Sequence, residues 1–518
     1  MNKEMLIPSY TLILFFKGFL WRERFLGEVL RALEDAVGSD YVSVDDFVLY
    51  TYSRGIEGAL EEVMPEYVVR PGSTDEVSRV VKVANKYKVP IVPRGGGCCL
   101  MGGSKPIEKG GIVIDMTRMN RLLDINFEAM TVSVECGITW AKLNTVLFEK
   151  GYYTGTLGPG SGMSATVGGG LSHHSVGGGG ATKYGTCSEH CVALEVVLPQ
   201  GDVVQTGSNA SVYIKEPFCR LGLGPDLLSI FLGDNGIFGI KTKATLEIFP
   251  RPEYHECKTF VVENPGDINV AKIWLEWRKM GDLGIYDSQY LPPLTVVAYS
   301  GLLTEFPFIP AWKGIDKGIL WYTIEAYTED ELEEKVRLAD GAVKRHGGEE
   351  LGEKIEDGNI ARWHYEKHGF WQNWHALWNI AGPGCVPCST EHHVPIHRMP
   401  DMFRAFEKWE EENRSLLEKA GAFSGVSTTI LCGHTTVEVD SGLVVWDRHE
   451  LRSLNKQLWI SQMHMVIKNG GMPYMTGELY SQALVDAAAF PEPYFELLRT
   501  LKRTLDPNRI LSPGKYRL

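Results

Sequence analysis

Three glycine-rich segments in the first half of the chain constrain its fold more than any other feature. They occupy residues 93–104, 164–186 and 233–242, and each adjoins an apolar run that predicts a buried strand. Consecutive glycines let the backbone turn tightly and point several N–H groups into one concavity, which suits a pyrophosphate. The first segment is not a Walker loop, because no Gly-Lys-Ser/Thr follows it, and it lacks a clean G-x-G-x-x-G motif. Three such segments in order predict a cradle for an anionic dinucleotide.

Composition excludes several classes of protein. The chain has 518 residues, of which 44% are hydrophobic and 23% charged, as expected for a packed globular protein of two or three domains. A net charge of −13 excludes a nucleic-acid partner, because binding a phosphate backbone needs clustered Lys and Arg. Ten cysteines are too few for a disulfide scaffold in a chain of this length, so we expect free thiols in a cytoplasmic location.

The N-terminal segment leaves three interpretations open. Residues 7–20 are mostly apolar, but Pro8, Ser9 and Lys17 interrupt them. They are also fewer than the ~20 residues that cross a bilayer, so we expect no transmembrane span. A packing or membrane-surface segment, a secretory signal, and an extension from a misassigned start codon all fit. The first of these keeps peripheral membrane association open.

The hydrophobic pattern predicts an α+β chain. A domain boundary is expected where Pro250 and Pro252 follow a strand. The predicted divisions are 1–60 as an N-terminal extension and helix, 61–252 as the cofactor domain, 253–490 as a substrate or cap domain, and 491–518 as a C-terminal segment. Helices are predicted at 23–37, 73–87, 138–150, 329–345 and 400–419, strands at 67–71, 89–93, 111–115, 132–135 and 244–249, and a hairpin at 192–198 and 203–206.

Several short motifs occur in a fixed order over residues 60–252 and in the last 25 residues. They lie at 70–77, 93–97, 113–120, 134–139, 165–170, 184–186, 195–201, 224–228, 239–242, 506–508 and 513–515. In these motifs the chain resembles the vanillyl-alcohol oxidase / p-cresol methylhydroxylase superfamily of FAD-dependent oxidoreductases. Within that superfamily it is most similar to the glycolate oxidase / D-lactate dehydrogenase branch.

The resemblance implies a split FAD-binding domain of the p-cresol methylhydroxylase (PCMH) type. That domain consists of two α+β subdomains completed by the C-terminal tail, and an α+β cap domain covers the flavin. By similarity, the first glycine segment would hold the FAD pyrophosphate. The implied FAD contacts are Pro93, Arg94, Gly95, Gly96, Gly97, Cys98, Cys99, Gly102, Gly103, Ser104, Gly158, Pro159, Ala165, Thr166, Gly168, Gly169, Gly170, His173, His174, Tyr184, Gly185, Thr186, Gly236, Gly239 and Ile240.

Covalent attachment of the flavin occurs in parts of this superfamily through His, Cys or Tyr. Cys98, Cys99, His173 and His174 lie in the two segments expected nearest the cofactor. We expect non-covalent FAD and keep a covalent link as the alternative.

The expected cap departs from the motif of the hydroxy-acid branch. That branch carries His-x-Gly-Asp-Gly-Asn-x-His as part of a metal-assisted site, whereas residues 433–440 keep only His434. We therefore predict no metal ion. His392 or His393 could accept a hydroxyl proton, since imidazole titrates near neutral pH, or both could be structural. Glu478 also matches a family position.

Two further features leave alternatives open. Residues 363–378 hold four tryptophans, which could form an aromatic wall over the flavin or simply pack a helix. Cys385-x-x-Cys388 could bind a metal or a cluster, but without a second such pair we expect ordinary thiols.

These observations predict an FAD-dependent dehydrogenase or oxidase acting on CH–OH groups. Hydride would pass from a hydroxyl-bearing carbon to flavin N5. The first candidate substrate is a 2-hydroxy carboxylate of the lactate or glycolate type, and the second is an aromatic or bulky apolar alcohol or an alkylphenol. A third hypothesis is a flavin-carrying subunit of a larger redox complex. The expected partners are a small hydroxylated substrate, an electron acceptor or redox protein, and further copies of the chain.

Overall fold

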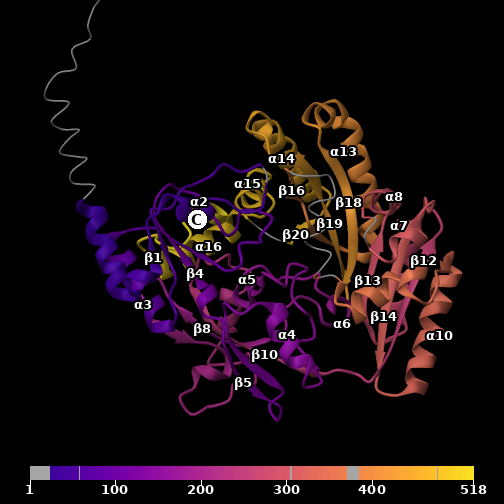
Figure 1. The fold of residues 1–518 in the computed structure, drawn as a ribbon, viewed down its shortest axis with the longest axis horizontal. Coiled ribbons are helices and arrows are strands. Elements are labelled where there is room, and N and C mark those ends of the chain that lie inside the picture. Colours follow the sequence, from indigo (N-terminus) through magenta and orange to yellow (C-terminus); the bar gives the residue numbers. More distant parts are fainter. Residues whose placement is uncertain (1–23, 58, 304–305, 370, 372–383, 475–476) are drawn as a thin grey trace, which may run out of the picture.

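The computed structural model describes residues 24–518 except 58, 304–305, 370, 372–383 and 475–476. Two parts lie side by side. The first is built on two smaller sheets, and the second on one large antiparallel sheet (Figure 1). Across the described residues, no helix combines the length and apolarity that crossing a membrane requires. The apolar segment 7–20 lies outside the described residues.

The first small sheet places the first glycine segment. Its strands run in the order β1-β2-β4-β3, with β2, β4 and β3 parallel. Helix α3 covers it with Val77, Val80 and Val81, and the Ser73 hydroxyl caps the helix by accepting from the Glu76 amide at 3.2 Å. The elements are β1 (Val42–Ser43), α2 (Asp46–Tyr52), β2 (Tyr67–Val69), α3 (Thr74–Tyr87), β3 (Ile91–Arg94) and β4 (Ile112–Asp115), with a further helix at 24–37.

The second small sheet is antiparallel, in the order β5-β6-β10-β8-β9. The predicted hairpin is confirmed: β8 pairs with β9, and Gly201 turns the chain with φ +87°. Helix α4 packs Trp140, Leu143 and Leu147 into the core beneath this sheet. The elements are β5 (Leu122–Asn126), β6 (Thr131–Glu135), α4 (Trp140–Phe148), β7 (Tyr152–Tyr153), α5 (Val167–Leu171), α6 (Ala181–Tyr184), β8 (Cys191–Val197), β9 (Val203–Gln205), β10 (Ile240–Glu247) and β11 (Phe249–Pro250).

The large sheet of the second part runs in the order β15-β12-β14-β13-β18-β19-β17-β20, and β16 also pairs with β19. One face packs against α7, α10, α13 and α14, burying Trp274, Trp277, Trp409 and Trp459. The other face meets α8, α9 and α11. The strands are β12 (Tyr254–Val262), β13 (Ile285–Leu291), β14 (Gly318–Ala326), β15 (Gly348–Glu350), β16 (Cys385–Ser389), β17 (His392–Pro395), β18 (Phe423–Cys432), β19 (Thr436–Trp446) and β20 (Met472–Pro473).

Both long helices predicted in the second half are confirmed. Helix α10 covers the predicted residues, and α13 extends the predicted span by one residue at each end. The Thr328 hydroxyl caps α10, and Gly421 ends α13 in the left-handed conformation. The helices are α7 (Gly266–Lys279), α8 (Pro293–Leu302), α9 (Ile309–Trp312), α10 (Glu329–Arg345), α11 (Ile360–Glu366), α13 (Met399–Ala420), α14 (Arg452–Lys468), α15 (Glu478–Asp486) and α16 (Glu492–Leu505).

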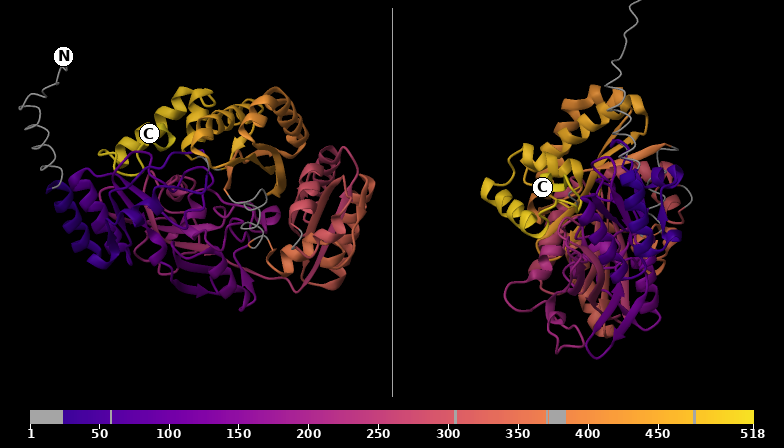
Figure 2. Two further views of the ribbon diagram at one scale, coloured as in Figure 1. Left: turned by 45° about the horizontal axis from the view of Figure 1, so that its top comes forward. Right: turned by 90° about the vertical axis from the view of Figure 1, so that its left-hand side faces the viewer.

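The C-terminal tail returns to the first part, as expected (Figures 1 and 2). The Ser512 amide donates to the Ile91 carbonyl at 2.7 Å, and the Ile91 amide donates to the Ile510 carbonyl at 2.6 Å. The tail therefore extends the edge of the first small sheet beside β3. The predicted domain boundaries stay predictions.

A buried ammonium group holds this tail in place. Lys502 of α16 donates to the Ile237 and Leu511 carbonyls and to the Asp506 carboxylate, all within 2.8 Å. Lys502 is 3% exposed and Asp506 is fully buried. Since a buried carboxylate without its cation is costly, we expect Lys502→Met to lower the free energy of unfolding by about 3–5 kcal/mol.

Denaturant unfolding of the variants Lys502→Met and Arg503→Met measures the loss of unfolding free energy caused by each substitution in α16. Arg503 is exposed on the same helix, and its pair with Glu496 should contribute less than about 1 kcal/mol. Equal stability losses in the two variants would contradict the anchoring role of Lys502.

Candidate active site

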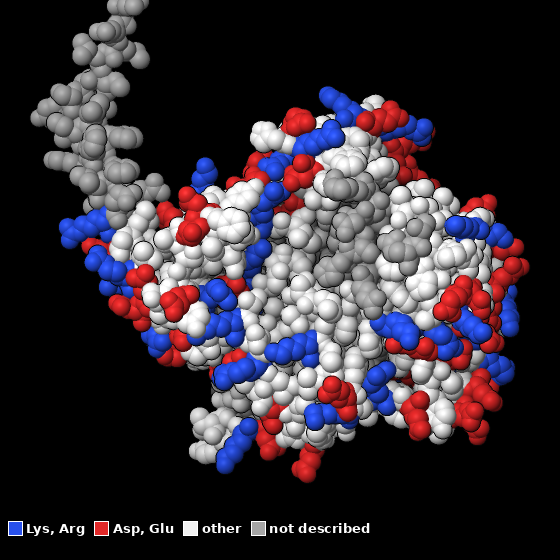
Figure 3. All heavy atoms as spheres, in the orientation of Figure 1, with Lys and Arg blue, Asp and Glu red and all other residues white. Residues whose placement is uncertain are grey.

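A cavity of about 790 Å³ lies between the two parts of the molecule. Its volume falls within the range of about 300–1,000 Å³ usual for cofactor and substrate pockets. One wall consists of the glycine segments, and the other consists of the large sheet with α8 and α11. Charged side chains gather around the periphery, while mostly uncharged atoms lie where the parts meet (Figure 3). We call the two sides the glycine wall and the sheet wall.

The glycine wall is built from backbone that leaves no room for side chains. Strand β3 ends at Arg94, and the chain then passes directly over the second glycine segment. A Cβ on Gly96 would lie 1.9 Å from the Ser164 carbonyl oxygen, and one on Gly95 would lie 2.2 Å from the Thr166 hydroxyl. Gly97 has φ +71°, which few other residues adopt. Only glycine allows these two segments to meet.

The same wall presents hydrogen-bond donors to the cavity. Among the described residues, the amides of residues 95–98 donate to no backbone carbonyl. The Ser104 hydroxyl oxygen is buried and has no hydrogen-bond partner within the described chain. Arg94 donates to the carbonyls of Arg54 and Ser104, and burial lowers its pKa. Free donors around one cation, in a cradle that a Cβ would fill, fit the pyrophosphate of FAD.

The structure brings most of the predicted cofactor residues to the cavity. Gly102 and Gly158 instead lie behind the wall, where Cβ atoms would meet Leu60 and Trp140. The lining includes Pro93, Arg94, Gly95, Gly96, Gly97, Cys98, Cys99, Gly103, Ser104, Pro159, Ala165, Thr166, Gly168, Gly169, Gly170, His173, Gly236, Gly239 and Ile240. The predicted residues outside the lining are Gly102, Gly158, His174, Tyr184, Gly185 and Thr186.

The sheet wall carries three carboxyl groups that the sequence did not single out. Glu438 and Asp440 alternate along β19 and face the cavity, and Glu391 joins them from the link between β16 and β17. A hydrogen bond joins the side chains of Glu391 and Asp440, so this pair holds a proton. Burial raises the pKa of Asp440 to about 6. Burial and neighbouring carboxyls raise the pKa of Glu391 and of Glu438 well above the usual range.

Tyr474 connects the two walls. Its hydroxyl oxygen accepts from the Val176 amide of the second glycine segment at 2.8 Å. Its backbone amide donates to the Glu391 carbonyl at 3.1 Å. Burial and the nearby Glu391 carboxyl raise the pKa of Tyr474 well above the usual range, so the phenol stays neutral. The carboxyl pair is thereby held beside the glycine wall.

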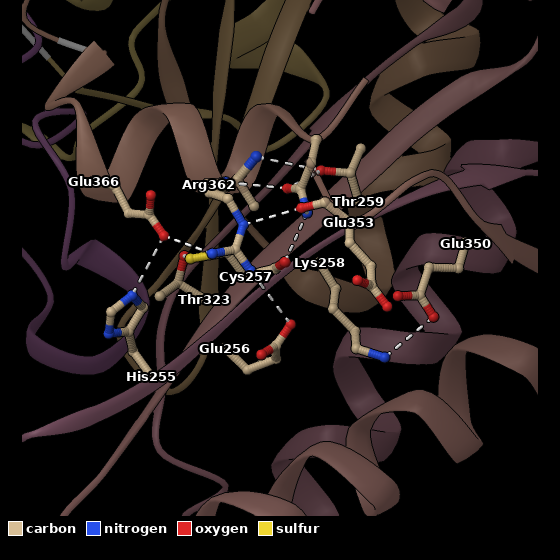
Figure 4. Close-up of polar contacts among 12 residues, drawn as sticks. His255, Glu256, Cys257, Lys258, Thr259, Thr323, Glu350, Glu353, Arg362 and Glu366 are labelled. Atoms are coloured by element: carbon tan, nitrogen blue, oxygen red, sulfur yellow. Dashed lines mark hydrogen bonds and ion pairs between the residues drawn. The ribbon is translucent and has the colours of Figure 1, made fainter. Parts of the chain in front are cut away.

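Helix α11 supplies a histidine to the sheet wall. The His364 ring stacks on Trp321 with centroids 5.3 Å apart, and burial lowers the pKa of His364 to about 3. The outer side of α11 is fixed to β12 and its neighbours (Figure 4). Arg362 bonds Glu366 at 2.6 Å and the Glu353 carbonyl at 3.0 Å, and the Asn359 amide donates to the Cys257 carbonyl at 2.8 Å. These bonds fix helix α11, so that His364 stays stacked on Trp321. Burial keeps its imidazole neutral.

The structure does not bring the predicted catalytic residues to the cavity. His392 points to the opposite face of the sheet, where its ring stacks on Phe406, because successive side chains of a strand alternate. His393 lies beside Tyr474, outside the lining. His434 is exposed in the turn between β18 and β19, and Glu478 pairs with Lys105 at 3.5 Å. One sequence feature could have revealed the carboxyl groups of the sheet wall. It is the alternation Val437-Glu438-Val439-Asp440, which puts Glu438 and Asp440 on the same face of a strand.

The remaining sequence features are placed as follows. Trp363 and Trp371 are buried among aromatic side chains, whereas Trp374 and Trp378 lie outside the described residues. Cys388 is buried in β16. In the part of the chain that the structure describes, no group of three or more His, Cys, Asp or Glu side chains could hold a metal ion.

Comparison with known proteins agrees with this geometry. Residues 65–207 match the model of an FAD binding domain, and residues 305–516 match the C-terminal domain of FAD linked oxidases. The chain is 29% identical to D-lactate dehydrogenase (cytochrome), mitochondrial, of Arabidopsis thaliana, covering 87% of this chain and 73% of that protein. It is 35% identical to glycolate oxidase subunit GlcD of Bacillus subtilis (strain 168), covering 40% of this chain and 44% of that protein.

The fold also matches a solved structure. The crystal structure of p-cresol methylhydroxylase with substrate bound superimposes with a TM-score of 0.79 at 19% identity, covering 95% of this chain and 96% of that one. The expected PCMH-type fold is confirmed, and so is the resemblance. The chain belongs to the FAD-linked oxidoreductases of the vanillyl-alcohol oxidase / p-cresol methylhydroxylase superfamily.

Proposed function

We propose that this FAD-linked oxidoreductase oxidises a hydroxyl-bearing carbon inside the cavity between its two walls. The observation that carries the proposal is the arrangement of the cavity itself. Free amide donors line one wall, and a proton-sharing carboxyl pair lines the other. FAD supplies the hydride acceptor when it is bound. The chain then has to hold the cofactor, orient the alcohol and accept one proton.

The glycine wall holds the cofactor in this proposal. The amides of residues 95–98, with Arg94 and Ser104, bind the pyrophosphate. Residues 165–170 and His173 lie along the ribityl chain and the flavin, and Gly236, Gly239 and Ile240 contact the adenine half. Gly102, Gly158, His174, Tyr184, Gly185 and Thr186 support these segments from behind the lining.

The carboxyl pair accepts the hydroxyl proton. Oxidation of an alcohol releases one hydride from carbon and one proton from oxygen. Glu391 and Asp440 share one proton, so the pair has one ionised oxygen that can accept the second. The phenol of Tyr474 stays neutral and positions Glu391 against the glycine wall. His364 is also neutral and adds an aromatic surface rather than a charge.

Two substrate classes have separate support. The names of the relatives, D-lactate dehydrogenase and glycolate oxidase, favour a 2-hydroxy carboxylate. The lining of the sheet wall favours an aromatic or bulky apolar alcohol or an alkylphenol, because it combines Tyr299, Trp321 and Tyr474 with aliphatic side chains. The name of p-cresol methylhydroxylase points the same way.

The partners of the reaction stay predictions. Reduced flavin needs an electron acceptor, either a small molecule or a redox protein. A role as flavin-carrying subunit of a larger complex, a homo-oligomeric state, a cytoplasmic location and peripheral membrane association are kept as hypotheses.

The first test follows the flavin spectrum of the purified protein without oxygen. We expect at least one alcohol from a panel of D-lactate, glycolate and aryl alcohols to bleach the absorbance of the bound oxidised flavin, because hydride transfer reduces it. Bleaching by D-lactate or glycolate would select the first substrate class. A flavoprotein that no hydroxylated compound of the panel reduces would contradict the proposal.

The second test concerns the cofactor cradle. We expect Gly96→Ala to weaken FAD binding about tenfold or more, because the new Cβ would force the backbones of residues 96 and 164 apart. The matched control is Gly301→Ala, an exposed glycine of α8 outside the cavity lining, whose Cβ would meet nothing within 4 Å. Flavin content per chain after purification measures the effect, and normal content in Gly96→Ala would rule out the predicted cradle.

The third test concerns the proton acceptor. We expect Asp440→Asn to slow flavin reduction by about 100-fold or more, since Asp440 is the ionised member of the pair and an amide cannot take the proton. His393→Gln should change the rate much less, because His393 lies outside the cavity lining. Stopped-flow absorbance under anaerobic conditions gives both rates. A larger loss in His393→Gln would restore the histidine as the base.

The pH profile of the same rate gives the fourth test. Only the ionised pair accepts a proton, so the rate should rise with pH. Burial raises the pKa of Asp440 to about 6 and that of Glu391 further, so the rise should fall at or above about pH 6 rather than near pH 4. A rate that falls across this range would contradict a carboxyl base.

A further inference from the structure

We propose that the sheet wall binds a positively charged group of the substrate, with Glu438 as its counter-ion, so that the preferred substrate is an amino alcohol. The inference rests on the proposed function, because it takes the cavity as the substrate site. It adds the charge and a second functional group to the substrate.

The charge balance of the cavity is the first observation. Three carboxyl side chains line the sheet wall, whereas the Lys and Arg side chains in the described lining, Arg94 and Lys241, belong to the glycine wall. Lys241 is already paired with Asp234 at 2.5 Å. No Lys or Arg of the described sheet wall therefore pairs with these acids.

Glu438 is the member of this group that most needs a partner. Its side chain is 2% exposed, and its Oε1 atom has no hydrogen-bond partner among the described residues. Glu391 and Asp440 bond to each other, but Glu438 has no such link. A buried carboxyl oxygen without a hydrogen-bond partner is costly, and a cationic donor beside it would stabilise the ionised form of Glu438, whose pKa is otherwise raised by burial.

A second unpartnered group lies on the same face of the sheet as Glu438. The indole N–H of Trp321 lines the same cavity, is 2% exposed as a residue, and has no acceptor in the described structure. An indole N–H can only donate, so it suits the oxygen of a hydroxyl group. The rings of Tyr299, Trp321 and Tyr474 also offer π faces to an organic cation. Strands β13 and β18 lie between Trp321 on β14 and Glu438 on β19, so the ammonium group of a small amino alcohol pairs with Glu438 while an aromatic substituent contacts these rings.

Other ligands match the wall less well. A 2-hydroxy carboxylate would add a negative charge beside the carboxyl pair, whose ionised oxygen repels it, and would offer Glu438 no counter-ion. A neutral diol would leave Glu438 without a counter-ion. A divalent cation needs several close oxygen ligands, and the described residues offer no such group. The aromatic lining favours an organic ammonium ion.

The test uses three ligands that differ only in the substituent next to the carbinol carbon. They are mandelate, which is anionic, 1-phenylethane-1,2-diol, which is neutral, and 2-amino-1-phenylethanol, which is cationic. Rapid anaerobic mixing with the FAD-loaded protein gives a dissociation constant for each, from the concentration dependence of the reduction rate or, where no reduction occurs, of the shift in flavin absorbance. We expect the amino alcohol to bind about tenfold or more tighter than the diol, and mandelate to bind weakest.

Two variants connect this order to Glu438. In Glu438→Gln, the ratio between the dissociation constants of diol and amino alcohol should fall to about one, because the counter-ion is gone. In Glu349→Gln, which changes an exposed acid on β15 of the same sheet, the ratio should stay as in the wild type. If Glu438→Gln does not retain flavin, the order in the wild-type protein still decides.

The outcomes separate this inference from the proposed function. If mandelate or the diol binds as tightly as the amino alcohol, the cation site is refuted, although bleaching by any of them still supports oxidation of the carbinol. If mandelate binds tightly only after addition of manganese chloride, the wall is a metal site and the inference is also refuted. If the amino alcohol binds tightest but no ligand of this kind reduces the flavin, the site stands and the proposed oxidation fails.

Discussion

Contact between two stretches of backbone is the constraint on which the rest of the structure depends. Residues 95–96 lie so close to residues 164–166 that a single Cβ would overlap a carbonyl or hydroxyl oxygen. Because no side chains intervene, the amides of both segments can face one cavity. The ammonium group of Lys515, fully buried, bonds the carbonyls of Gly103 and Asn235 and so connects the first and third glycine segments. The C-terminal tail is therefore part of the cofactor cradle.

The two walls divide the chemistry between them. The glycine wall offers donors and positive charge to an anionic dinucleotide, whereas the sheet wall offers acceptors and aromatic surface to the substrate. Strand alternation makes this division possible, since β19 places Glu438 and Asp440 on the cavity face and Val437 and Val439 in the core on the other face. Buried, uncompensated carboxyls oppose folding, and they persist where they serve binding or catalysis. Tyr474 fixes the spacing between the walls through its bond to Val176.

Local signals allowed much of the fold to be predicted. Ser73 and Thr328 cap helices where the sequence predicted them, and Gly201 turns the predicted hairpin. The glycine segments also predicted the cofactor wall, because runs of glycine in the sequence mark places where the backbone carries no side chains. The sheet wall was not predicted, since it depends on pairing between strands far apart in the chain. Glu391 and Glu438 meet only because β17 lies beside β19. The same pairing turns His392 away from the cavity, which a motif comparison could not reveal.

The most direct test of the central claim is the isotope effect on flavin reduction. In the proposed reaction, a hydride leaves a hydroxyl-bearing carbon in the cavity while a carboxyl pair takes the proton. An alcohol that bleaches the flavin should therefore react several-fold more slowly when deuterium replaces hydrogen at its carbinol carbon. Rapid-mixing absorbance measurements with the two isotopologues would show this difference. Equal rates, from a substrate that binds and reduces the flavin to the same extent, would contradict the account.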